Sequence, residues 1–101
     1  MTLEELNTLL SATGIPVAMD HFLTSQSLPY MVYIIPNDDT FPADNSTYHI
    51  SPIIQVELYS IRKDQALETT VETALAGFYF TKQEGYLDDE QMYMVTYTFA
   101  L

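Results

Sequence analysis

The chain lacks cysteine and has few basic side chains. Without cysteine it can form no disulfide bond, and it has no thiolate to bind a metal or attack a substrate. Fourteen acidic residues outnumber three basic ones, Arg62, Lys63 and Lys82, so the formal net charge is −11. This charge repels nucleic-acid phosphates, and we therefore expect no specific binding of DNA or RNA.

Glycine is also scarce, and the chain has no long apolar run. The three glycines, Gly14, Gly77 and Gly85, are far apart, which excludes a glycine-rich phosphate loop. No stretch approaches the roughly 18 apolar residues of a membrane span. The opening MTLEELNTLL begins with acids, whereas a signal peptide begins with bases and continues apolar. We expect a protein without a membrane partner that stays in the cytoplasm or leaves it within an assembly.

Hydrophobic residues nevertheless make up 48% of the chain, which is enough to form a core and argues against an unstructured acidic tail. A length of 101 residues predicts a single domain over residues 1–101. Thr2 and Glu5 have the spacing of a capping box, and the leucines that follow recur at helical spacing, which predicts a helix over residues 2–12. Asp64 is expected to cap a second helix over residues 65–76.

Alternating side chains predict five strands, at residues 17–19, 30–35, 48–61, 78–82 and 91–101. A polar segment, 37–47, and an acidic turn, 83–90, separate some of them. The order α-β-β-β-α-β-β predicts an α+β fold, with a mostly antiparallel five-stranded sheet and two helices on one face. Several strands are apolar on both sides, although a solvated face is normally polar. We therefore expect a second copy of the chain to cover the face that the helices leave open.

No pattern in the sequence indicates catalysis. His21 and His49 have no patterned partner, so we interpret them as surface or packing residues, although either could serve as a general base. Asp38, Asp39 and Asp44 could be calcium ligands, but they lack the glycine and glutamate of an EF-hand loop, and we interpret them as part of a solvated loop. We expect no catalytic site, no cofactor and no metal.

Several acidic residues are candidates for interaction surfaces. Asp64, Glu68 and Glu72 recur every four residues beside the apolar stripe of the second predicted helix, as either a solvated flank or a surface facing a channel or basic partner. The candidate interface residues in the polar segment and the acidic turn are Asp38, Asp39, Phe41, Asp44, Asp88, Asp89 and Glu90. Phe41 either docks on a partner or folds back onto the sheet. The eight tyrosines and five phenylalanines also suit protein interfaces.

Three segments together resemble a known family. They are the opening MTLEELNTLLSATGIPVAMDHF, the middle VELYSIRKDQALETTVETAL and the closing MYMVTYTFAL. In this order they resemble the small tail terminator and tail-completion (head-tail joining) proteins of long-tailed bacteriophages and prophages. The likeness is one of layout, runs over nearly the whole chain and includes no catalytic signature.

The resemblance implies an α+β protomer that forms a ring, commonly a hexamer, on the head-proximal end of the tail tube. Such a ring stops tube polymerisation and presents a surface to the head, while DNA passes through its channel. The implied partners are further copies of the chain, the tail-tube protein and the head-connector or head-completion protein. The implied location is the virion tail or neck, and the host cytoplasm during assembly. By position, segments 37–47 and 83–90 are candidates for contacts with neighbouring rings.

Two other functions are compatible with the sequence. The acid excess would suit a phage-encoded DNA mimic that blocks a host nuclease or restriction enzyme, although residues 21–37 and 91–101 carry no acids. A small-ligand enzyme or binding domain would instead use His21 or His49, and it would place that histidine in a concave pocket.

Overall fold

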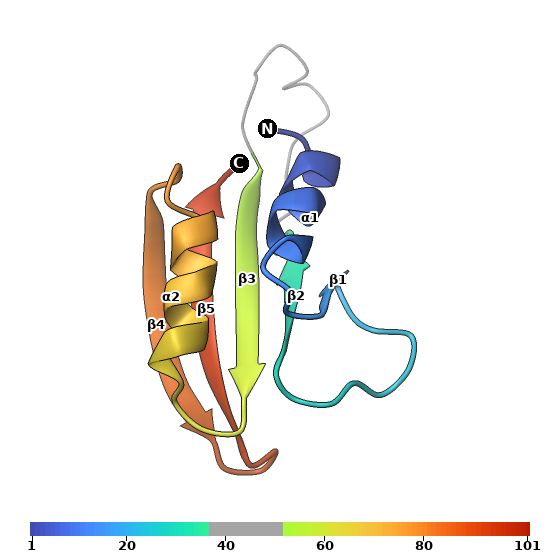
Figure 1. Ribbon diagram of the computed structural model, residues 1–101, viewed down its shortest axis with the longest axis vertical. Coiled ribbons are helices and arrows are strands. Elements are labelled where there is room, and N and C mark those ends of the chain that lie inside the picture. The colour runs from blue at the N-terminus through green and yellow to red at the C-terminus, as the bar shows by residue number, and fades with distance from the viewer. Residues whose placement is uncertain (37–51) are drawn as a thin grey trace.

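The computed structural model describes residues 1–36 and 52–101 (Figure 1). In chain order the elements are α1 (Leu3–Ser11), β1 (Val17–Met19), β2 (Tyr30–Ile34), β3 (Ile53–Ser60), α2 (Gln65–Ala74), β4 (Phe80–Leu87) and β5 (Met92–Ala100). This is the predicted order, and the α+β fold class is confirmed. None of the helices in these ranges is long and apolar enough to cross a membrane.

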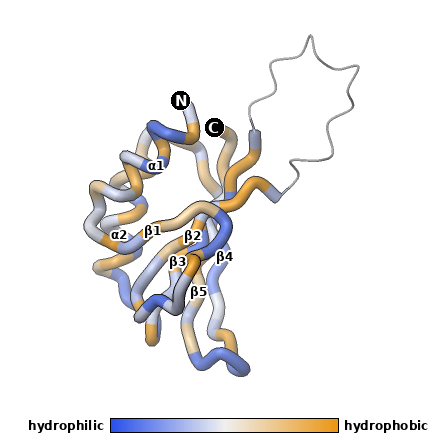
Figure 2. The backbone as a smooth tube through the Cα atoms, turned by 90° about the vertical axis from the view of Figure 1, so that its right-hand side faces the viewer, coloured by the Kyte–Doolittle hydropathy of each residue, from blue (hydrophilic) through white to orange (hydrophobic). Residues whose placement is uncertain are grey.

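The five strands form one mixed sheet in the order β1-β2-β3-β5-β4. β1 runs parallel to β2, and the other three pairings are antiparallel, so the sheet is mostly antiparallel as predicted. Both helices lie on the same face of the sheet (Figure 1). The side view in Figure 2 shows the same two layers, with the helices on one side and the strands on the other.

Local hydrogen bonds explain where the two helices begin, and a glycine allows the turn after α1. The Thr2 hydroxyl accepts from the Glu5 N–H at 3.1 Å, and the Glu5 carboxylate accepts from the Thr2 N–H at 2.8 Å, which completes the predicted capping box. Asp64 Oδ1 accepts from two backbone N–H groups, those of Ala66 and Leu67, at 3.1 and 3.2 Å. After α1 the chain turns through Gly14, whose φ of +84° is a conformation that glycine adopts without a steric cost.

The core lies between the two helices and one face of the sheet. α1 contributes Leu6 and Leu10, α2 contributes Val71, and Leu75 caps the end of α2; all four have no exposed surface. The facing side chains of the three central strands are Met31, Tyr33, Ile54, Val56, Leu58, Val95, Tyr97 and Phe99. They alternate along their strands as the sequence predicted, because successive strand residues point to opposite faces.

The position of the fourth strand was predicted wrongly. β4 covers Phe80–Leu87, whereas the sequence predicted a strand over 78–82 and an acidic turn over 83–90. The polar residues Lys82 and Glu84 suggested a turn, but in the sheet Lys82 bonds to Glu68 of α2 and Glu84 bonds to Lys63, just before α2. The connection between β4 and β5 is limited to residues 88–91. The third strand covers Ile53–Ser60 of the predicted range 48–61; Pro52 and Ile61 flank it outside the strand, and residues 48–51 lie outside the described residues.

Candidate functional site

The face of the sheet opposite the helices is the main candidate interaction surface. By strand alternation and register, its side chains on β3, β5 and β4 are Ile53, Gln55, Glu57, Tyr59, Met92, Met94, Thr96, Thr98, Ala100, Thr81, Gln83 and Leu87. We call this the open face. Among the described residues, helices lie only on the other face (Figure 2). Most of these side chains are partly exposed, and Ile53 is 39% exposed. The open face therefore presents apolar area to solvent within one copy of the chain.

Residues 20–26 cover part of the open face beside β2. The chain leaves β1 at Asp20, whose φ of +69° is in the left-handed region that aspartate tolerates better than most residues. The Asp20 N–H donates to the Tyr33 carbonyl at 2.8 Å, which fixes the start of this turn. Phe22 then packs edge-on against Tyr30, with ring centroids 5.5 Å apart and planes at 82°. The turn therefore places polar residues above the strands.

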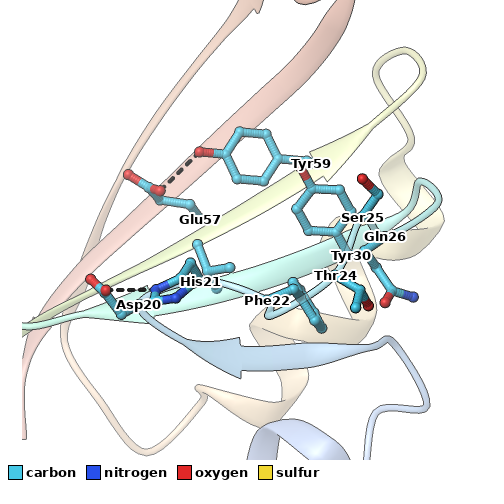
Figure 3. A pocket seen from close by; sticks show the side chains of 10 residues that line it. Asp20, His21, Phe22, Thr24, Ser25, Gln26, Tyr30, Glu57 and Tyr59 are labelled. Carbon is cyan, nitrogen blue, oxygen red and sulfur yellow. Dashed lines mark hydrogen bonds and ion pairs between the residues drawn. The ribbon is translucent and has the colours of Figure 1, made fainter.

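A cavity of about 320 Å³ lies between this turn and the sheet (Figure 3). Its lining residues are Asp20, His21, Phe22, Thr24, Ser25, Gln26, Tyr30, Val32, Glu57 and Tyr59. We call it the aromatic-acidic pocket. The rings of Tyr30 and Tyr59 lie 5.2 Å apart at 35° and form one wall. Aromatic faces carry negative charge density, so this wall favours a cationic group over an anionic one.

Glu57 is the half-buried carboxylate of the pocket. Its Oε1 accepts a hydrogen bond from the Tyr59 hydroxyl at 2.9 Å. Burial raises the pKa of Tyr59 well above its usual value, and the bond to Glu57 raises it further, so the hydroxyl remains a donor at neutral pH. In the parts of the chain that the structure describes, this is the one side-chain hydrogen bond of Glu57. The carboxylate therefore has further capacity to accept hydrogen bonds.

His21 and Asp20 form an exposed pair on the rim of the pocket. His21 Nδ1 lies 2.9 Å from Asp20 Oδ2, and the two side chains are 68% and 72% exposed. The hypothesis of a small-ligand domain placed a histidine in a concave pocket, and His21 does line one. His49 lies outside the described residues.

The three acids of the predicted helical flank have three different surroundings. Asp64 caps α2, while Glu68 is only 4% exposed and bonds to both Lys63 and Lys82, at 3.1 and 2.7 Å. Glu72 accepts from Lys82 at 2.8 Å and from the Tyr97 hydroxyl at 2.9 Å. The expectation of one solvated or channel-facing flank is therefore wrong for Glu68. Spacing along the helix could not reveal this, because the two lysines come from outside the helix.

Glu84 extends the same cluster along β4. It bonds to Lys63 and accepts from the Tyr93 hydroxyl at 2.6 Å. The bond from Lys63 lowers the pKa of Glu84, and the bond from Lys82 lowers the pKa of Glu72. We call Lys63, Lys82, Glu68, Glu72 and Glu84 the lysine-glutamate cluster. It joins α2 to β4.

Asp88, Asp89 and Glu90 occupy the connection between β4 and β5, and all three are exposed. The other predicted interface residues, Asp38, Asp39, Phe41 and Asp44, lie outside the described residues. Within the described ranges, no group of three or more histidine or acidic side chains is arranged to hold a metal ion.

Sequence reasoning missed the aromatic-acidic pocket. The predicted strands at 17–19 and 30–35 leave residues 20–29 without an element, and no pattern placed these residues over the sheet. Phe22 was the available signal, because an aromatic residue in a polar loop commonly packs on a nearby apolar surface.

No protein family matches the chain, and neither the curated proteins nor the solved structures include a match.

Proposed function

We propose that the protein is a structural component of a bacteriophage or prophage tail, a terminator or completion protein that assembles into a ring. The ring would cap the tail tube at its head-proximal end and contribute to joining the tail to the head. The observation that carries this proposal is the open face, a sheet surface with partly exposed apolar residues in a chain with a net charge of −11. Such a face is typical of a protein that buries it against another subunit.

The edges of the sheet suit the same role. β4 is an eight-residue edge strand, and all of its residues from Thr81 to Tyr86 are exposed. An edge strand presents unpaired backbone groups that another chain can pair with. Tyr79, just before β4, is fully exposed, and Tyr86 is 51% exposed. Tyrosine is enriched at protein interfaces, so this edge supports lateral contacts between protomers.

The charge distribution limits which partners are compatible. The lysine-glutamate cluster uses two of the three bases and three of the fourteen acids, leaving Arg62 and eleven acids. This remaining charge would repel DNA phosphates at a channel wall, which suits a ring through which DNA passes without sticking. Salt limits the repulsion to about 8–10 Å.

The test is the mass of the protein in solution at several salt concentrations. Each copy repels the next because of its net charge, so added salt should favour assembly. Light scattering should give several times the monomer mass of 11.5 kDa at high salt, or after purified tail tubes are added. A protein that stays monomeric at every salt concentration and does not bind tail tubes would refute the proposal.

The pocket favours a second candidate, a small-ligand domain that uses His21. This candidate predicts that His21→Ala abolishes binding of a small molecule without changing the assembly state. The DNA-mimic hypothesis has less support, because the three glutamates of the cluster are paired with lysines rather than displayed to a partner. Pull-down experiments with host nucleases would test it directly.

A further inference from the structure

The aromatic-acidic pocket combines features that favour one positively charged group. Glu57 supplies a half-buried carboxylate with a single described side-chain donor, and Asp20 supplies a second carboxylate at the rim. Tyr30 and Tyr59 supply an aromatic wall. A guanidinium group can bond to a carboxylate and stack on an aromatic ring at the same time. An arginine side chain is therefore the group that best fits this chemistry.

Arg62 is the base of this chain that the lysine-glutamate cluster does not use. It lies two residues after the end of β3, and it is exposed. It lines a hollow of about 200 Å³ together with Pro29, Ser60 and Leu67. Ser60 belongs to the helix-facing side of β3, whereas Glu57 and Tyr59 belong to the open face. Arg62 does not line the pocket of its own chain.

We propose that the aromatic-acidic pocket of one copy receives Arg62 of the next copy. This inference rests on the proposed function, since it assigns the contact by which the ring closes. The pocket lies on the open face, whereas Arg62 lies in the connection between β3 and α2. A contact between two different surfaces repeats from copy to copy and generates a closed ring when the rotation permits. Charge complementarity supports the pairing, because in the described residues Arg62 is the lysine or arginine side chain outside the lysine-glutamate cluster.

Charge-reversal variants test the contact. The Glu57→Arg and Arg62→Glu variants should each assemble only at protein concentrations at least about tenfold higher than the wild type needs. This is the effect expected from the loss of a charge-assisted hydrogen bond. Glu57→Arg also lowers the net negative charge of every copy. A general effect of charge would therefore strengthen assembly of this variant, whereas loss of the proposed contact weakens it. Glu4→Arg is the matched control. Glu4 is an exposed residue of α1 outside the pocket, so this variant makes the same change in net charge and should not weaken assembly.

An equimolar mixture of the two variants provides the decisive result. In an alternating ring, the glutamate at position 62 of one variant meets the arginine at position 57 of the other, and the native pair forms at the next interface. Assembly of the mixture should return to the wild-type concentration range. Glu57→Gln, which keeps the shape of the side chain, should weaken assembly as well, and circular dichroism should show all variants folded.

The outcomes separate this contact from the proposed function. If the wild type assembles and binds tail tubes while the folded single variants assemble equally well, the contact is wrong and the ring stands. If the single variants do not assemble and their equimolar mixture does not assemble either, the pairing of Arg62 with the pocket is wrong in this case as well. A wild type that never assembles overturns both.

Discussion

Glu68 shows how the surroundings of a single residue decide its role. In the sequence it is one of several acids in a chain with few bases, and its position on a helix suggested either a solvated flank or a surface facing a channel or basic partner. In the structure it is 4% exposed and lies between the ammonium groups of Lys63 and Lys82. A buried acid paired with two bases avoids most of the cost of an isolated buried charge.

Removing this carboxylate should destabilise the fold. Glu68→Ala leaves two lysines without a buried partner, and we expect the free energy of unfolding to fall by about 2 kcal/mol, discounted from the values for fully buried pairs because both lysines remain partly exposed. Urea denaturation measures the change. Asp89→Ala, which removes an exposed acid from the β4–β5 connection, is the matched control and should change stability little. Equal effects of the two substitutions would contradict a structural role for Glu68.

Glu72 makes the stability depend on pH. The bond from Lys82 holds the pKa of Glu72 below its ordinary value of 4.5, so its contribution is fully present above that value. It is lost as the pH falls through the lowered pKa of the folded state. Between pH 6 and pH 3, the wild type should therefore lose more stability than Glu72→Gln, measured by urea denaturation at each pH. Parallel pH profiles for the two proteins would rule out this contribution.

At the scale of the elements, local signals located the helices better than they located β4. The helix caps at Thr2 and Asp64 depend on neighbours within three residues, so the sequence alone could place them. The extent of β4 depends on distant residues instead. Glu84 remains in the strand with Lys63 and Tyr93 as partners, contacts that no local pattern contains. The same reason explains why the aromatic-acidic pocket was missed.

The cap of α2 gives a prediction at this scale. Asp64→Ala removes the acceptor for the N–H groups of Ala66 and Leu67 and should cost about 1 kcal/mol of stability. Asp64→Asn keeps an acceptor oxygen at the same place and should retain most of that stability. Thermal and urea denaturation of the two variants test the cap. A similar loss for both would mean that the charge of Asp64 matters rather than its hydrogen bonds.

At the scale of the whole molecule, the sequence predicted the layering but not the distribution of charge. The open face was expected from strands that are apolar on both sides, and the described residues do leave it without a helix (Figure 2). The sequence alone did not indicate which of the three bases bond to acidic side chains. The fold instead commits Lys63 and Lys82 to one side of the sheet and leaves Arg62 exposed at the end of β3. The difference between the two lysines in the cluster and the exposed arginine depends on the tertiary structure.

The two ends of the chain lie near each other at one end of the molecule, while β3 finishes at the opposite end (Figure 1). A fluorescent domain fused to Met1 or to Leu101 would therefore stand away from Arg62. If the copies assemble into a ring as proposed, either fusion should co-assemble with untagged copies, and its fluorescence would report that assembly.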